Sequence, residues 1–392
     1  MKRDPLARPE PSGQNAALAS GWARIWDLPT RLFHWLLVFC AVVAGKTGFF
    51  GPASGLDWHV WAGYGIGVLV VWRLIWGLLG SEYSRLDRLF GALRNLPEHI
   101  DGLRKLEPKH YAGHNPAGSL MILGLLVVLL GITATGIVVL GGVEKQGMLA
   151  GLTSYNIGHL TKGVHQVLAY GLVAMVLGHI GGVISEIVLL RVPLIRGMIT
   201  GWLPLAEDSL LRGSRPARPT LALIWTAVTA AVIAGLTLPL AAMPGLGVPA
   251  PVTNPTFLKE CAACHWAIHP SLLPRSSWKL IMSSLDQHFG EDASLPPAAA
   301  ADIGTFLEAN AAETVDTEPA NRLREVSANE PKRITATGFW QHMHHDIRDQ
   351  TFTSPAVKSK INCVACHKDA PSGRFDDQVI DIPHKSQTGD SQ

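Results

Sequence analysis

The sequence predicts an all-α fold in which a bundle of membrane-spanning helices precedes a smaller, helical and loop-rich soluble domain. Hydrophobic residues make up 47% of the 392 residues and charged residues only 16%, and the long apolar runs all lie in the first 245 residues. A stretch rich in Pro and Gly at 244–251 then leads into a segment of mixed composition. That segment lacks the apolar and polar alternation that is typical of strands, so we expect short helices, such as 275–288 and 298–310, joined by long loops.

Five apolar stretches are long enough to cross a bilayer, which takes about 20 helical residues. They lie at 32–50, 59–79, 118–140, 164–190 and 219–242. Lys46 interrupts the first stretch, but a lysine close to a helix end can reach the headgroups. The chain is therefore expected to have a four-span region at 1–205, a fifth span with its linker at 206–251, and a soluble domain at 252–392. The polar tail after Pro383 is expected to be disordered.

The basic residues predict how these spans are oriented. The N-terminal segment and the segments 81–117 and 191–218 are rich in Lys and Arg, whereas 51–58 and 141–163 hold only Lys145 and Lys162. Cytoplasmic segments carry the excess of Lys and Arg, so we expect the N-terminus inside and the soluble domain outside. Residues 1–20 contain no apolar core before a cleavage site, so the first span would act as the export signal. The net charge of +2 gives no support to nucleic acid as a partner.

Four of the five cysteines fall in two Cys-x-x-Cys-His frames. In this frame the two thiols attach to haem covalently and the histidine ligates the iron. A zinc site or a redox dithiol is the alternative, but spare cysteines for zinc and a thioredoxin-like context are both missing from the sequence. The sequence therefore predicts two c-type haems, attached through Cys261, Cys264, Cys363 and Cys366 and ligated by His265 and His367. The fifth cysteine, Cys40, lies in an apolar run and is expected to be a small buried hydrophobe.

The opposite axial position of each c-type haem has several possible ligands in the soluble domain. These are His269, His288, His342, His344, His345 and His384, with Met282 and Met343 as softer ligands. We prefer His288 for the first haem because it lies at the end of an apolar helical stretch. We prefer His344 for the second, with His345 close behind, because the 342–345 cluster precedes the second frame. A surface histidine is the alternative for each, and spacing alone does not decide.

Four histidines lie in the predicted spans, where ionisable residues are rare and usually functional. His165 and His179 are 14 residues apart, which is close to four helical turns, so they share one face with about 21 Å between them. One helix could then ligate two stacked b-type haems. The expected depths pair His34 with His179 and His59 with His165. Arg73 follows His59 by 14 residues and could neutralise a propionate of the inner haem; a snorkelling arginine is the alternative.

The same residues resemble two known families. The run 26–35 (WDLPTRLFHW), His59 with Gly63, the downstream 73–77 and the run 113–118 (GHNPAG) resemble the bacterial cytochrome b561 family, which includes b-type subunits of nickel–iron hydrogenases. That resemblance covers about residues 20–205. The segments around both cysteine frames resemble the soluble dihaem cytochrome c family over about 252–384. The fifth span is extra to the usual four-helix core, and it can deliver the C-terminus to the outer side.

The resemblance implies a protein of the bacterial inner membrane with its c-type domain in the periplasm. It would pass electrons between the quinone pool, or a membrane redox partner, and a periplasmic acceptor through two b haems and two c haems. It supports His34, His59, His165 and His179 as ligands of the b haems. Arg31 is expected to bind a cofactor with Arg73, and it is a candidate quinone contact with His159 and Lys162.

Two other functions stay open. A haem with an open axial position would react with superoxide or another small ligand. The chain could also anchor a larger hydrogenase or dehydrogenase through a catalytic oxidoreductase subunit, and a homodimer is compatible with either role. The chain has no glycine-rich nucleotide loop, nucleophile triad or Fe–S cysteine set in its sequence, so we do not expect it to be a dehydrogenase itself.

Overall fold

The computed structural model describes residues 22–52, 55–105, 111, 113–204 and 216–383. The polar tail beyond 383, His384 and parts of the basic segments at 1–21 and 205–215 lie outside the described residues. Contacts divide the chain into two compact units. Unit 1 comprises the described parts of Met1–Lys46, Trp58–Ala134 and Val164–Gly235, and unit 2 those of Thr47–Asp57, Thr135–Gly163 and Leu236–Gln392.

Within the described ranges, five helices are long and apolar enough to cross a membrane, and they coincide with the five predicted spans. They are α2 (Leu28–Phe50), α3 (Leu56–Leu79), α6 (Pro116–Gly142), α7 (Tyr155–Leu190) and α9 (Pro219–Ala241). Helix α7 has 36 residues and begins nine positions before the predicted stretch (164 minus 155). At 1.5 Å per residue it is about 54 Å long, which exceeds the ~30 Å hydrocarbon thickness, so part of it extends beyond the bilayer.

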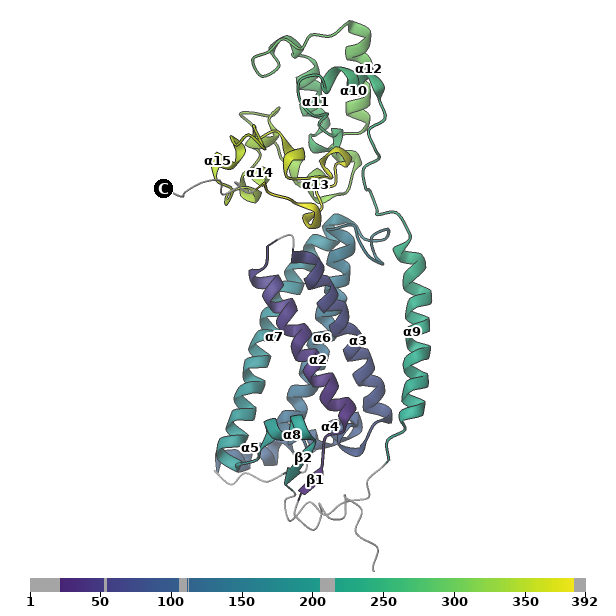
Figure 1. The fold of residues 1–392 in the computed structure, drawn as a ribbon, viewed down its shortest axis with the longest axis vertical. Helices are drawn as coiled ribbons and strands as arrows, with labels where there is room; N and C mark the ends of the chain where they lie inside the picture. Colours follow the sequence, from purple (N-terminus) through teal and green to yellow (C-terminus); the bar gives the residue numbers. More distant parts are fainter. Residues whose placement is uncertain (1–21, 53–54, 106–110, 112, 205–215, 384–392) are drawn as a thin grey trace, which may run out of the picture. The chain divides into compact units, whose positions relative to one another are not determined.

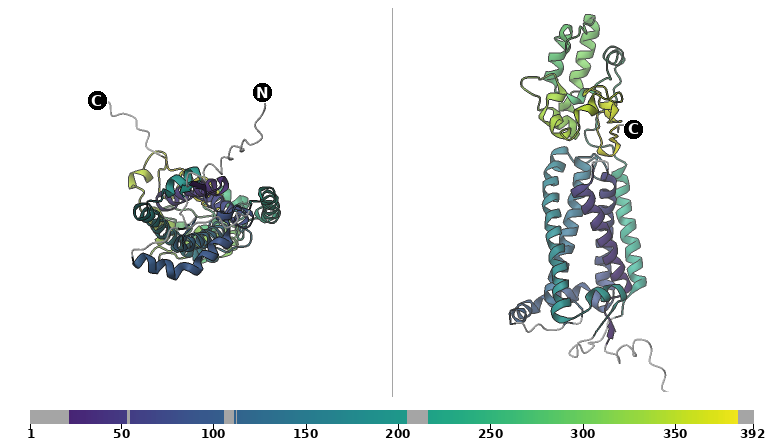
Figure 2. Two further views of the ribbon diagram at one scale, coloured as in Figure 1. Left: turned by 90° about the horizontal axis from the view of Figure 1, so that it is seen from below. Right: turned by 60° about the vertical axis from the view of Figure 1, so that its left-hand side comes forward.

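Helices α2, α3, α6 and α7 run side by side as a bundle (Figure 1; Figure 2). Their shared core contains Phe33, Ile66, Val70, Leu126 and Leu129, and Cys40 packs against it as expected of a small hydrophobe. A Cβ at Gly67 of α3 would lie 2.8 Å from the Thr133 methyl group of α6. Glycine therefore allows these two helices to approach closely, as is common in membrane bundles.

A small sheet and several short helices join the ends of the unit 1 helices. Strand β1 (Trp22–Arg24) pairs antiparallel with β2 (Trp202–Pro204), with Ala23 opposite Leu203. Helix α8 (Leu194–Thr200) ends at Gly201, whose φ of 90° suits glycine. The Gly201 carbonyl accepts hydrogen bonds from the backbone amides of Ile25 and Trp26, so the start of α2 is held beside α8. The remaining helices of this unit are α4 (Leu86–Ala92) and α5 (Leu96–Arg104).

Unit 2 continues into a loop-rich region with short helices, as the sequence predicts. These are α10 (Pro255–Cys261), α11 (Arg275–Met282), α12 (Pro297–Ala309), α13 (Glu318–Leu323), α14 (Gly338–Met343) and α15 (Asp349–Phe352). A core of ten buried residues, including Phe257, Trp278, Ile303 and Leu307, holds α10, α11 and α12 together. In the described part of 252–392, pairing between extended residues is limited to isolated bridges.

The predicted helix 298–310 is present as α12, but the predicted helix 275–288 is wrong at its end. Helix α11 stops at Met282, because the hydroxyls of Ser283 and Ser284 bond back to the Leu280 carbonyl and compete with the helical pattern. Residues 289 and 290 then form a tight turn with φ values of 56° and 101°, closed by hydrogen bonds between His288 and Glu291. His288 therefore lies at the start of this turn, directly after the 3-10 helix Leu285–Gln287, and not at the end of α11.

Candidate haem-binding sites

Four pairs of imidazole rings have nearly the same separation. The ring centroids lie 6.4 Å apart in His34–His179, 6.1 Å in His59–His165, 6.2 Å in His265–His288 and 6.1 Å in His344–His367. Two imidazoles that bind one metal from opposite sides, each through a bond of about 2.0–2.1 Å, have centroids roughly 6.3 Å apart, because a ring nitrogen lies roughly 1.1 Å from the centroid. All four separations fit a metal ion between the rings, and these are the pairs that the sequence predicts.

Two of these pairs join membrane helices of unit 1. Helix α7 supplies both His165 and His179, and α3 and α2 supply His59 and His34 opposite them. His59 Nδ1 lies 3.0 Å from the Ala44 carbonyl oxygen. A proton on Nδ1 donates to this carbonyl, so Nε2 carries the lone pair that would bind a metal.

Arg73 of α3 is buried within unit 1 and does not snorkel to the surface. Only 3% of its surface is exposed, and its guanidinium lies 6.0 Å from the ring of Phe33, the neighbour of His34. Among the described residues, its Nη1 atom has no hydrogen-bond partner. A buried guanidinium with an unused donor fits an anionic group such as a haem propionate.

Asp27 is a half-buried acidic residue that the sequence reasoning did not single out. Its carboxylate accepts hydrogen bonds from the Trp76 indole at 3.0 Å, the Ser81 hydroxyl at 2.5 Å and the Thr30 amide at 2.8 Å. Burial raises the pKa of Asp27, but these hydrogen bonds outweigh burial and hold it below the ordinary value. Asp27 lies directly before α2, where Asp is a favoured N-cap residue, but five positions before the predicted stretch 32–50, so the predicted boundary hid this signal.

Arg31 forms a hydrogen bond with α8, in which its Nη1 atom donates to the Ile199 carbonyl. Its Nε atom is buried and has no partner within the described ranges. The structure thus places Arg31 at the joint between α2 and α8, and its expected role in cofactor or quinone binding stays a prediction.

The first cysteine frame begins at the end of α10. The Asn254 side chain caps this helix by accepting the Phe257 amide at 2.8 Å, and the frame continues from Cys261 through Cys264 to His265. His265 Nδ1 lies 2.7 Å from the Trp266 carbonyl oxygen, and the 288–291 turn presents His288 to the same ring. We call this group, with both cysteines, the Cys261 site.

The second frame starts in a short 3-10 helix, Cys363–Ala365, and the His367 amide donates to the Cys363 carbonyl at 2.8 Å. Opposite His367, the ring of His344 stacks on Trp340 with centroids 4.4 Å apart and its Nδ1 lies 2.8 Å from the Trp340 carbonyl. We call this group, with Cys366, the Cys363 site.

The thiols of both sites differ from those of a redox dithiol. Burial is the main cause that raises the pKa of Cys261 to about 11 and that of Cys363 to about 12. Reactive dithiols instead have a lowered thiol pKa. The raised pKa values of Cys261 and Cys363 therefore argue against a redox dithiol.

The other possible axial ligands have different surroundings. His269 is 2% exposed, and its two ring nitrogens lie 2.8 Å from the Ser271 hydroxyl and 3.2 Å from the Ala250 carbonyl. His342 and His345 are exposed and stack on each other at 5.8 Å. The geometry thus favours His288 and His344 as ligands.

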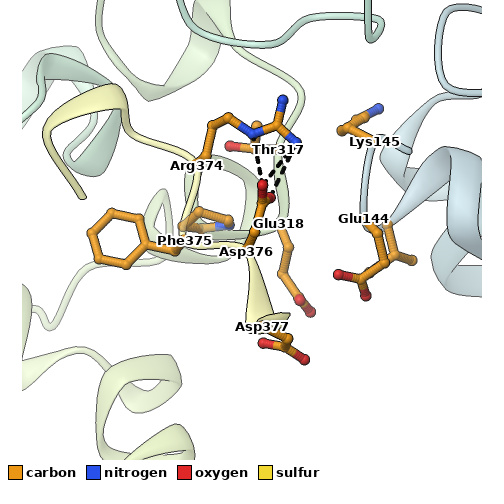
Figure 3. A pocket seen from close by; sticks show the side chains of 10 residues that line it. Glu144, Lys145, Thr317, Glu318, Arg374, Phe375, Asp376 and Asp377 are labelled. Carbon is orange, nitrogen blue, oxygen red and sulfur yellow. Dashed lines mark hydrogen bonds and ion pairs between the residues drawn. The ribbon is translucent and has the colours of Figure 1, made fainter. Parts of the chain in front are cut away.

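A pocket in unit 2 gathers carboxylates from the loop after α6 and from the C-terminal region. Figure 3 shows the side chains of Glu144, Glu318 and Asp377 facing one another, with Arg374 paired to Asp376. Burial, together with the charges of Asp377 and Glu318, raises the pKa of Glu144 to about 8.

The two remaining quinone candidates lie near this pocket. His159 stacks on Tyr155 with centroids 5.4 Å apart, and Lys162 is close enough to oppose the rise in the pKa of Glu144. Their expected contact with quinone stays a prediction.

Paired histidines on membrane helices and two Cys-x-x-Cys-His frames define a multi-pass membrane protein that carries haem and transfers electrons. Residues 25–201 match the model of the prokaryotic cytochrome b561 family, and residues 257–375 match that of the dihaem cytochrome c family.

Relatives match each part of the chain separately. A protein of Azotobacter vinelandii named "Probable Ni/Fe-hydrogenase B-type cytochrome subunit" is 26% identical over 214 residues, which are 47% of this chain and 89% of the relative. Among solved structures, the crystal structure of DHC purified from Rhodobacter sphaeroides holds a chain with 37% sequence identity. The match covers 32% of this chain and 98% of that chain, with a TM-score of 0.24. A solved structure of a dihaem cytochrome c from Shewanella baltica OS155 has 31% sequence identity. The match covers 33% of this chain and 93% of that chain, with a TM-score of 0.27.

Proposed function

We propose that this chain is a tetrahaem conduit that passes electrons between the quinone pool, or a membrane redox partner, and a periplasmic acceptor. Four ring pairs at 6.1–6.4 Å carry this proposal, because each pair can hold one six-coordinate haem iron. Haem iron supplies one-electron transfer when it is bound. A second histidine opposite each frame histidine favours electron transfer over reaction of superoxide or another small ligand at an open iron.

In this proposal, the histidines would ligate the haems and a buried arginine would bind a propionate. His34, His59, His165 and His179 would ligate two b haems in the bilayer, and Arg73 would bind a propionate with its unused Nη1. His288 and His344 would complete the two c-type sites. The excess of Lys and Arg in the segments 81–117 and 191–218 supports a cytoplasmic N-terminus, and hence a periplasmic c-type region after the fifth span.

A pyridine haemochrome spectrum of the purified full-length chain tests the proposal. We expect two b haems and two c haems per chain. Replacement of His165 by Ala should remove one b haem, and replacement of His179 by Ala the other, while both c haems remain. A chain that contains c haem alone would refute the paired membrane histidines.

The match to a hydrogenase cytochrome subunit favours a second role, in which the chain anchors a catalytic oxidoreductase. The two roles are compatible, because an anchor subunit can also conduct electrons. Purification in mild detergent from the native membrane tests the anchor role: a catalytic subunit should accompany the chain in stoichiometric amount. Quinol oxidation by the isolated chain at the rate of the membrane-bound form would argue for an independent protein.

A further inference from the structure

Trp266 connects the Cys261 site to the Cys363 site by a hydrogen bond. Its indole Nε1 donates to the Ile361 carbonyl at 2.7 Å, across 95 positions of the sequence. The same carbonyl accepts the Cys363 amide at 3.0 Å and lies 3.6 Å from the Cys363 sulfur. The indole of Trp266 therefore donates to the Ile361 carbonyl oxygen, which also contacts Cys363 of the second frame.

The backbone of Trp266 contacts the first site at the same time. His265 Nδ1 lies 2.7 Å from the Trp266 carbonyl oxygen, so a proton on Nδ1 donates to it and Nε2 faces the metal position. One residue thus makes a hydrogen bond to the proposed axial ligand of one site and another beside the attachment cysteine of the other. Saturated carbons separate the indole N–H of Trp266 from its backbone carbonyl, so the position of this residue is what links the two hydrogen bonds.

Packing fixes Trp266 in this position. Its side chain lies against the hydrophobic core that includes Phe257 and Trp278. Trp340 and Phe375 pack against the same core, and they contact His344 and His367 at 4.4 Å and 5.0 Å. The two sites therefore share one rigid aromatic support, and Trp266 is the member that hydrogen-bonds toward both.

We propose that Trp266 is a positioning residue that couples the two c-type sites, so that the oxidation state of one changes the reduction potential of the other. This inference rests on the proposed ligand pairs. A change in charge at the Cys363 site alters how strongly the Ile361 carbonyl attracts the Trp266 indole, and the resulting small displacement of Trp266 changes the hydrogen bond between its backbone carbonyl and His265. The strength of the His265 Nδ1 hydrogen bond affects how basic this ligand is and hence the potential of its iron.

The ring angles allow the Cys261 site to be followed separately by electron paramagnetic resonance. The planes of His265 and His288 differ by 24°, whereas those of the other three pairs differ by 68°, 56° and 76°. Near-parallel ligand planes give a rhombic low-spin ferric signal, and strongly crossed planes give a highly anisotropic one. The rhombic signal of the full chain therefore reports the Cys261 site alone.

The test is a potentiometric titration of the rhombic signal in the full chain and in two variants. Trp266→Phe removes the indole donor and keeps most of the packing. Trp278→Phe is the matched control, because Trp278 donates to the Pro270 carbonyl at the same 2.7 Å and belongs to the same core, but this bond does not lead to the second frame.

In the unchanged chain, we expect the Cys261 site to deviate from a one-electron Nernst curve. The deviation should equal a shift of roughly tenfold in the equilibrium constant for reduction of this site, which is the effect of about one net hydrogen bond. A tenfold shift corresponds to about 59 mV for one electron. Trp266→Phe should remove most of this shift and Trp278→Phe should keep it.

If the rhombic signal of the unchanged chain follows a simple one-electron Nernst curve, the two sites are not coupled and the inference is overturned. Equal loss of the shift in both variants would also overturn it, since Trp266 would then act through the stability of the core. If the rhombic signal or two c haems are missing from the unchanged chain, the proposed ligand pairs fail instead. The two failures are therefore distinguishable.

Discussion

The buried ion pair of Lys145 and Asp316 gives the most quantitative prediction for the stability of unit 2. The Lys145 side chain is 2% exposed and its Nζ atom lies 2.8 Å from Asp316 Oδ2, whose side chain is 26% exposed. Lys145 also donates to the Thr153 carbonyl at 3.1 Å, and Asp316 accepts the Tyr155 amide at 2.8 Å. The pair thus joins the loop between α6 and α7 to the start of α13 within unit 2.

Two single substitutions should have unequal effects on the free energy of unfolding. Asp316→Asn leaves the Lys145 ammonium buried without its counter-charge, so we expect a loss of about 3–5 kcal/mol. Lys145→Met leaves a partly exposed carboxylate that keeps the Tyr155 amide, so the loss should be smaller, about 1–3 kcal/mol. The double variant leaves no unpaired buried charge and should lose less than Asp316→Asn alone.

Denaturant unfolding of the purified chain, followed by circular dichroism of the haem absorption band, measures these differences. Lys279→Met is the control, because Lys279 and Glu308 form an exposed ion pair at 3.4 Å that should contribute at most about 1 kcal/mol. Additive losses in the double variant, or a larger loss for Lys145→Met than for Asp316→Asn, would contradict the reasoning.

Three further predictions concern the haem sites and pH. His288→Ala should convert one c haem to a high-spin form that binds carbon monoxide, while His345→Ala, at an exposed residue, should leave the spectrum unchanged. Arg73→Gln should lower the ratio of b to c haem in the haemochrome assay, and an unchanged ratio together with unchanged b-haem potentials would exclude a propionate contact. Because the pKa of Glu144 is raised from 4.5 to about 8, the folded state binds the extra proton and stability should fall as pH rises from about 4.5 to 8. Glu144→Gln should reduce this slope, which melting temperatures across that range would measure; the raised pKa values of Asp376 and Asp377, which burial mainly causes, add to the slope that remains.

The five membrane helices could be predicted because long apolar runs are a local signal. The start of α7 could not, since the residues 155–163 (YNIGHLTKG) are too polar for a hydropathy window although they continue the same helix. Hydropathy detects the part of a helix that lies in lipid and misses the turns that extend beyond it.

The pairing of the membrane histidines could be expected because a helix converts sequence distance into depth, as with His165 and His179. No such rule applies to the loops of the c-type region. There His288 is placed by a turn at residues 289 and 290, and Trp266 meets Ile361 across 95 positions. Contacts of this kind depend on the tertiary fold and leave no periodic signal in the sequence.

Both units nevertheless orient histidines through the same kind of hydrogen bond, from Nδ1 to a backbone carbonyl. Nδ1 of His59, His265 and His344 lies 3.0, 2.7 and 2.8 Å from a backbone carbonyl oxygen. His59 is in a membrane helix, His265 is the last residue of a cysteine frame, and His344 directly follows α14. Each bond fixes the ring and makes Nε2 the more basic ligand. His34 differs, because its buried Nδ1 has no hydrogen-bond partner among the described residues. We therefore expect the ligands of the His34–His179 pair to donate less electron density to iron than those of the His59–His165 pair, which would give the two membrane sites different potentials.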